Sequence, residues 1–181
     1  MKAQDKALDY VVRWRQVKYP RLELVTGRLV VVAPPGYDVE ALLERRREWV
    51  EHKLREIAEL KKQAASLPVL NRGLPELKSM LQTLIEHVSG GMGVDVRKLI
   101  VRKMRTKWAS MSRRATLTAN SLMRHLPEDL IFYIIVHEMS HSKEKRHSRR
   151  FWSYVERFYP QFEEAERRLA AYWFALQDEK A

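Results

Sequence analysis

The chain has 181 residues, 45% of them hydrophobic and 31% charged, and its formal net charge is +11. This composition suits a soluble globular domain with an appended element, and the absence of cysteine excludes disulfides. No window approaches roughly eighteen uninterrupted apolar residues, which excludes a transmembrane helix and a membrane as partner. Because Met1–Lys6 lacks the apolar core of a signal peptide, we expect a cytoplasmic protein.

The first part of the chain, residues 1–66, is predicted to form a β-hairpin and a long helix. Leu22–Val25 and Leu29–Val32 are rich in β-branched and aliphatic residues and are separated by a short turn, which predicts the hairpin. Asp38 is a suitable N-cap for a helix that runs to about Ala65. Apolar residues recur along that helix at helical spacing, so we expect one face to pack against the hairpin.

Proline and glycine in Ser66–Pro75 end that helix and mark the boundary of a second domain, residues 67–181. A helix over about Glu76–Val88 follows. We interpret Gly90–Gly93 as its C-cap and a turn. At the other end of this domain, apolar residues at helical spacing predict a packing helix over about residues 160–177.

Two strands precede the most hydrophobic segment of the chain. Leu99–Trp108 and Thr116–Ala119 predict an antiparallel pair. Pro127 then begins a helix, because proline fits the first turn and the two carboxylates after it complement the helix dipole. This helix contains the apolar run Leu130–Val136, so it must be buried. We therefore expect an α+β fold in which a buried helix lies beside a small antiparallel sheet.

The sequence His137-Glu138-Met139-Ser140-His141 ends the buried helix. At 3.6 residues per turn, His137 and His141 lie one above the other on one face and can offer imidazole nitrogens to one ion. Glu138 projects beside them, where its carboxylate can take a proton from a metal-activated water. The motif predicts a catalytic site for one zinc ion per chain, with Glu138 as general base and peptide-bond hydrolysis as the reaction.

A catalytic zinc usually has three protein ligands, and without cysteine the third must be His, Asp or Glu. We favour His147, which follows a polar stretch long enough to leave the helix and turn back toward the metal. Ser148 then resembles the N-cap of another helix. The rival ligands are Glu156 and, less favourably placed, Glu163, because other zinc peptidases use two histidines and a glutamate. The spacing does not match the longer motif of the metzincins.

Several linked stretches of the sequence resemble the YgjP-like metallopeptidases, predicted metal-dependent hydrolases that are more distantly related to SprT-like proteases. The resemblance implies a zincin-like catalytic unit with His137, His141 and His147 as metal ligands and Glu138 as the base. One departure is Ala109-Ser110-Met111, where the family tends to have Gly-Ser-Cys. The similar stretches are Arg105–Ser110, Leu117–Asn120, Leu126–Pro127, Tyr133–His141 and His147–Trp152.

In zincins the sheet beside the metal helix commonly offers an edge on which an extended substrate adds as a strand. By analogy we place the cleft beside the two predicted strands. The residues expected to contact a peptide or protein substrate there are Arg105, Lys107, Trp108 and Asn120. Of these, Lys107, Arg105 or Asn120 is expected to polarise the scissile carbonyl.

The basic composition leaves two alternatives to a peptidase. Lys143–Arg150 is strongly basic, and bases alternate with aromatics over Arg13–Arg21, as on surfaces that bind nucleic acid or another anionic partner. A nucleic-acid-associated hydrolase usually gathers several carboxylates around paired ions, whereas only Glu138 and Glu144 lie near this motif. A binding module with a non-catalytic zinc would need a fourth ligand, often a thiolate. The peptidase is therefore the preferred hypothesis.

Overall fold

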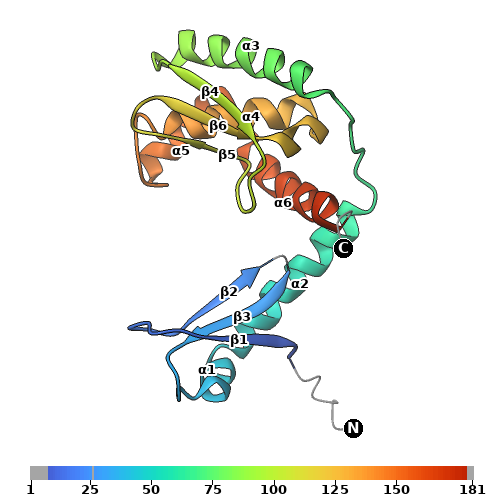
Figure 1. Cartoon of the computed structure of the whole chain (residues 1–181), viewed down its shortest axis with the longest axis vertical. Coiled ribbons are helices and arrows are strands. Elements are labelled where there is room, and N and C mark those ends of the chain that lie inside the picture. The colour runs from blue at the N-terminus through green and yellow to red at the C-terminus, as the bar shows by residue number, and fades with distance from the viewer. Residues whose placement is uncertain (1–7, 26, 179–181) are drawn as a thin grey trace.

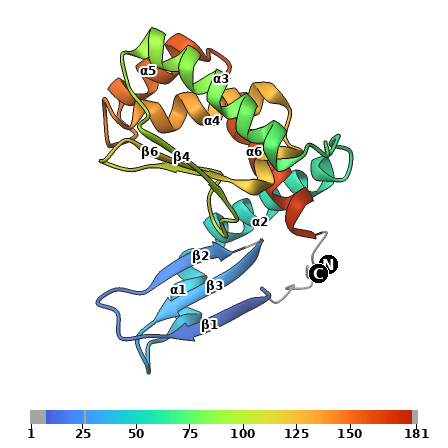
Figure 2. The ribbon, with the colours of Figure 1, turned by 45° about the horizontal axis from the view of Figure 1, so that its top comes forward.

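The structure, a computed structural model, describes residues 8–25 and 27–178. The expectation about Met1–Lys6 therefore lies outside the described residues. Two sheets, each with its own helices, make up the fold, and Figures 1 and 2 show them as a lower and an upper part of the molecule. None of the described helices is long and apolar enough to cross a membrane.

The lower part is a three-stranded sheet covered on one face by two helices (Figure 2). Its strands are β1 (Tyr10–Trp14), β2 (Arg21–Val25) and β3 (Arg28–Ala33), in the order β1-β3-β2. The pair β2–β3 is antiparallel, which confirms the hairpin, and β1 is parallel to β3. The helices are α1 (Val39–Arg45) and α2 (Arg47–Ala64).

The single long helix expected after Asp38 is interrupted. Asp38 caps α1 as predicted, since its Oδ1 accepts the N–H of Ala41 at 2.9 Å. At Arg46 the backbone leaves helical geometry, with φ −116° and ψ 11°, because its N–H bonds to the carbonyl of Leu43 and closes the first helix. Apolar residues of both helices bury against the sheet as one cluster, formed by Leu29, Val31, Ala33, Val39, Leu43 and Val50.

The upper part places a buried helix beside a second three-stranded sheet (Figure 1). Its helix α4 (Glu128–Ser140) has eight buried residues and lies at the centre of the larger hydrophobic cluster. The expected α+β fold class is confirmed. The other elements of this part are α3 (Leu74–Met92), β4 (Lys98–Arg102), β5 (Ala109–Met111), β6 (Thr116–Asn120), the short 3₁₀ helix η1 (Ser121–His125), α5 (Arg149–Phe158) and α6 (Phe162–Asp178).

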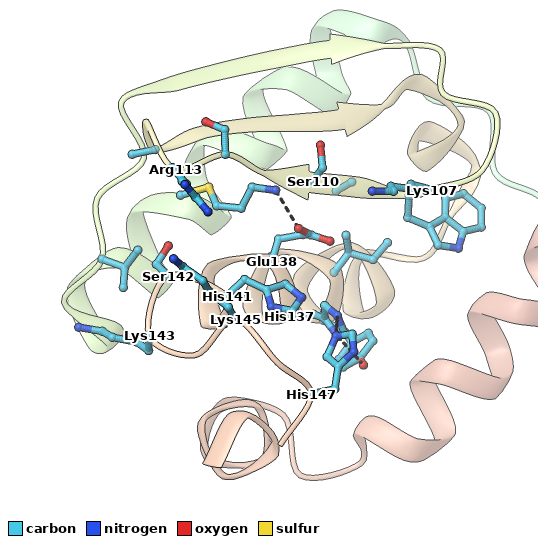
Figure 3. A pocket seen from close by; sticks show the side chains of 18 of the residues that line it. Lys107, Ser110, Arg113, His137, Glu138, His141, Ser142, Lys143, Lys145 and His147 are labelled. Carbon is cyan, nitrogen blue, oxygen red and sulfur yellow. Dashed lines mark hydrogen bonds between the residues drawn. The ribbon is translucent and has the colours of Figure 1, made fainter. Parts of the chain in front are cut away.

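The upper sheet is mixed, so the prediction of a purely antiparallel pair was wrong. The strand order is β4-β6-β5, with β4 parallel and β5 antiparallel to β6. After β4 the chain turns back and forms β5 two strand positions away, and β6 then fills the position between them. As a result β5 is an edge strand, bonded to β6 on one side and facing α4 on the other (Figure 3).

Helix α3 continues further than the glycines predicted. Gly90 and Gly91 lie inside the helix, and the chain leaves it at Gly93, whose φ of 61° is the left-handed cap conformation that glycine favours.

The two parts of the molecule meet where α2 lies along α6, and both views show these helices side by side. The segment that joins α2 to α3 is held in place by a hydrogen bond, which the Tyr172 hydroxyl donates to the carbonyl of Pro68 at 3.0 Å.

Candidate active site

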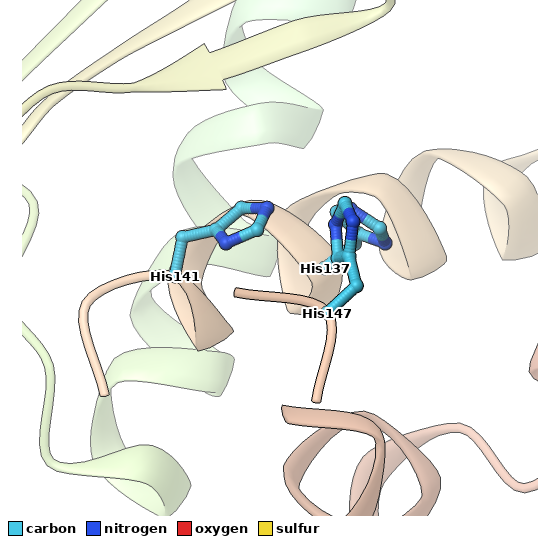
Figure 4. A group of neighbouring side chains, drawn as sticks. All are labelled: His137, His141 and His147. Atoms are coloured by element: carbon cyan, nitrogen blue, oxygen red, sulfur yellow. The ribbon is translucent and has the colours of Figure 1, made fainter. Parts of the chain in front are cut away.

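The two histidines of the motif lie in the last turn of α4 and at its C-cap. Buried Ile134, Ile135 and Val136 fix this helix in the core, so the turn that follows them carries its side chains to the edge of the core. His137 and His141 are one turn apart, and their ring centroids are 5.2 Å apart. Figure 4 shows both rings on the same side of the helix end.

His147 joins the two helical histidines. The chain leaves α4 after His141 and turns back, and α5 is capped by Ser148, whose Oγ accepts the N–H of Phe151 at 3.3 Å. This N-cap, which the sequence predicted, fixes the residue just before it. The Nε2 atoms of His147 and His137 are 3.2 Å apart. One nitrogen from each of the three rings lies within 4.8 Å of the others.

Among residues 8–25 and 27–178 this is the only cluster of His, Cys, Asp and Glu side chains close enough to hold a metal ion. The rival ligands Glu156 and Glu163 are not part of it. Both are exposed, on α5 and α6.

The three imidazoles suit a divalent metal such as zinc. Two nitrogens bound to one tetrahedral ion at about 2.0–2.1 Å are separated by about 3.3 Å, close to the 3.2 Å between His137 and His147. A histidine ring binds a metal ion only in its neutral form. Burial, followed by the effect of positive charge on His141 and His147, lowers the pKa of His137 from 6.5 to about 4, so this ring is neutral over the physiological range.

Two aromatic rings of α5 pack against the three histidines. Phe151 is fully buried, and its ring centroid lies 5.0, 4.6 and 4.7 Å from those of His137, His141 and His147. Trp152 stacks on His147 at 5.6 Å, which restricts the ring that comes from the loop. Neither residue was assigned a role from the sequence, although both lie in the similar stretch His147–Trp152, three and four residues after the predicted N-cap.

Glu138 lies between the histidine cluster and the edge strand β5. Its Oε2 accepts the backbone N–H of Met111 at 2.9 Å, the dashed line in Figure 3. Burial raises the pKa of Glu138, and the Met111 bond and the charge of Lys107 act in the opposite direction. The carboxylate is therefore held next to the histidines in an environment that increases its basicity.

A cavity of about 1120 Å³ opens over these residues. It lies between β5 on one side and α4 with its following loop on the other, and His137, Glu138, His141 and His147 all line it (Figure 3). The basic residues Lys107, Arg113, Lys143 and Lys145 also line it, with Asp95 and Glu166 as the acidic residues besides Glu138.

The four expected substrate contacts have different positions. Lys107 and Trp108 line the cavity, whereas Arg105 is exposed and does not. The expectation that Asn120 contacts the substrate was wrong, because its side chain is fully buried and does not reach the cavity. A buried amide must satisfy its hydrogen bonds internally, and this one bonds the loop before β5, at Met104 and Lys107, and the N–H of Leu122.

Two residues near His137 were not anticipated from the sequence. Tyr133 lies one turn before His137 on α4, and its hydroxyl is 3.2 Å from Nδ1 of that histidine. The same hydroxyl donates a hydrogen bond to Glu166 of α6. Burial, reinforced by Glu166, raises the pKa of Tyr133, so the hydroxyl keeps its proton. The helical spacing of Tyr133 was visible in the sequence, but nothing local to α4 indicated Glu166.

Residues 74–172 match the metallopeptidase domain of the YgjP-like proteins, and this match covers more than half of the chain. The chain belongs to the YgjP-like metallopeptidase family. The family expected from the motifs is thereby confirmed, and the match contains the whole histidine cluster. A metal ion and a peptide or protein substrate are the corresponding expectations for such a domain.

Two solved structures are similar to this YgjP-like chain over 49% of its length and 90% of theirs. The metallopeptidase zymogen abylysin of Pyrococcus abyssi is 29% identical, with a TM-score of 0.46. The metallopeptidase zymogen jannalysin of Methanocaldococcus jannaschii is 24% identical, with a TM-score of 0.43. No curated protein matches the chain.

Proposed function

We propose that the protein is a zinc-dependent peptidase in which His137, His141 and His147 hold one ion and Glu138 is the general base. The observation that carries this proposal is the position of Glu138, which lies between the three clustered imidazoles and the edge strand β5 inside one cavity. A bound zinc ion supplies Lewis acidity, which makes water a stronger acid and a carbonyl carbon a better electrophile.

Strand β5 provides the binding edge for an extended peptide. The N–H of Ser112 bonds to the carbonyl of Thr116 in β6, so the main-chain groups of Ala109 and Met111 point to the opposite side, toward the cavity, where Glu138 accepts the Met111 N–H. A substrate that adds to this edge forms main-chain hydrogen bonds independent of its sequence. Its scissile carbonyl then lies over the histidine cluster, with Lys107 beside the site.

Glu138 moves the proton. Oε2 is held by the N–H of Met111, and no described residue bonds to Oε1, which is therefore free to take a proton from the attacking water. Glu138 then passes that proton to the nitrogen of the leaving amine, so one carboxylate acts as base and as acid. No carboxylate joins the three histidines among the described residues, which favours this chemistry over a two-metal nuclease.

The proposal is tested by metal content and by cleavage. We expect about one zinc per chain in protein purified without added metal or tag, and loss of that zinc in His141→Ala. Glu138→Gln should keep the zinc and cleave a peptide library at least about 100-fold more slowly. Glu156→Gln is the matched control and should keep both properties. A wild-type protein that binds no zinc at neutral pH would contradict the proposal.

A further inference from the structure

Each ring nitrogen of His137 has a different environment. Its Nε2 points to the Nε2 of His147, inside the cluster proposed to hold the ion. Its Nδ1 points the other way, to the hydroxyl of Tyr133 at 3.2 Å. A neutral imidazole carries its proton on only one nitrogen, so the partner of Nδ1 determines whether Nε2 is free to bind a metal.

Glu166 determines the direction of the hydrogen bonds around Tyr133. The hydroxyl has one proton, and a carboxylate can only accept, so the proton of Tyr133 points to Glu166. The hydroxyl oxygen is left to accept, and the proton on His137 must lie on Nδ1 to supply that bond. The chain of bonds from Glu166 through Tyr133 therefore leaves the lone pair on Nε2 of His137.

The two partners come from separate elements. Tyr133 is on α4 and is 1% exposed, whereas Glu166 reaches from α6 and lines the cavity with its side chain 51% exposed. Its carboxylate is also 3.8 Å from Nδ1 of His137. Helix α6 is held next to the site by Trp173, which packs edge-on against Trp108 at 5.0 Å.

We propose that Tyr133 and Glu166 are positioning residues that orient His137 and fix its proton on Nδ1, so that the site binds its metal tightly. The inference rests on the proposed function only in that the three histidines are the ligands. His141 has a comparable partner, since its Nδ1 lies 3.3 Å from the carbonyl of Glu144. Second-layer partners of this kind usually change metal affinity 10- to 100-fold when removed.

The experiment measures zinc dissociation constants by competition with a chelator, and cobalt absorption spectra of the same variants. Glu166→Ala frees the Tyr133 hydroxyl to donate to Nδ1, which favours the proton on Nε2, the wrong nitrogen. We expect its zinc affinity to fall about 10- to 100-fold, with a changed cobalt spectrum. Glu166→Gln keeps an acceptor oxygen and should recover most of the affinity. Glu163→Ala, an exposed glutamate of the same helix, should match wild type.

Unchanged zinc affinity and an unchanged cobalt spectrum in Glu166→Ala would overturn the inference. The double variant Tyr133→Phe/Glu166→Ala also removes the hydroxyl that donates to Nδ1 in Glu166→Ala, so it should bind zinc no more weakly than Glu166→Ala, and still weaker binding would contradict the assigned direction of the hydrogen bonds. If the double variant does not fold, Glu166→Ala alone decides, because its partly exposed side chain is not part of the core. Absence of zinc binding in the wild type would instead contradict the proposed function, so the two failures are distinguishable.

Discussion

The imidazole of His137 makes the metal-free protein sensitive to acid. Its pKa is about 4 in the folded chain, against 6.5 ordinarily. Between these values the unfolded chain binds a proton that the folded chain excludes, so lowering the pH favours unfolding. The free energy of unfolding should therefore fall from pH 6.5 toward pH 4, by at most about 3 kcal/mol, because one pKa unit corresponds to about 1.4 kcal/mol.

Urea unfolding of chelator-treated protein at several pH values measures this effect. His137→Gln removes the titrating ring and should show a weaker dependence on pH than wild type over the same range. His52→Gln is the control, because His52 lies on α2 with its side chain 61% exposed. Equal pH dependence in wild type and His137→Gln would show that the buried ring does not cause the loss.

At the scale of single elements, two adjacent glycines of α3 have different surroundings. A Cβ on Gly90 would meet nothing within 4 Å, whereas a Cβ on Gly91 would lie 2.8 Å from Cε1 of Phe158 on α5. Gly90→Ala should stabilise the protein by up to about 1 kcal/mol, because alanine is the better helix former. Gly91→Ala gains the same propensity but must displace the Phe158 ring, so it should be less stable than Gly90→Ala.

Thermal or urea unfolding of the two alanine variants compares the same chemical change one residue apart, so each is the control for the other. Equal stability would show that the contact between α3 and α5 tolerates a methyl group. The sequence alone suggested a turn at these glycines, because a close approach between helices is a tertiary contact without a local pattern.

The loop between β4 and β5 depends on Asn120. Its side chain bonds to backbone groups of Met104 and Lys107 in that loop. Asn120→Ala leaves these groups without a partner and should cost about 2–4 kcal/mol of unfolding free energy. We also expect slower peptide cleavage with zinc content intact, because the loop leads into β5 whereas the histidines lie on α4 and the segment before α5.

Chemical unfolding, zinc content and cleavage rate of Asn120→Ala test this role. Thr83→Ala is the control, since its hydroxyl donates only to Ser79 on an exposed face of α3 and should matter by less than about 0.5 kcal/mol. Loss of zinc together with cleavage, at unchanged stability, would contradict a role in holding the loop.

The elements that the sequence predicted well are those with local patterns. The motif fixed His137, Glu138 and His141 by helical spacing, and the serine before α5 predicted the cap that positions His147. Glu166 has no such signal, because it reaches the site only through the packing of α6. The parallel pairing of β4 with β6 likewise could not be predicted from the sequence, since strand propensity does not specify which strand is the neighbour.

At the scale of the whole molecule, the chain has a net charge of +11, and its excess of basic residues extends to the candidate site. Four basic residues, Lys107, Arg113, Lys143 and Lys145, line the cavity against three acidic ones, and Figure 3 shows the basic side chains on both its sheet side and its helix side. A positive potential in a cavity attracts anionic substrates and weakens as salt screens it. We therefore expect acidic peptides to be cleaved with higher kcat/KM than neutral ones, and this preference to shrink with added salt.

Arg113→Glu tests whether the charge in the cavity, and not the charge of the whole protein, causes that preference. Arg113 lies on the turn after β5, away from the histidines, so the variant should keep its zinc. For acidic peptides, kcat/KM should fall roughly three- to tenfold, with little change for neutral peptides. Arg55→Glu changes the net charge by the same amount on α2, outside the cavity lining, and should leave the preference intact. Equal losses in both variants would assign the effect to net charge, and no loss in either would show that the basic cavity does not select substrates.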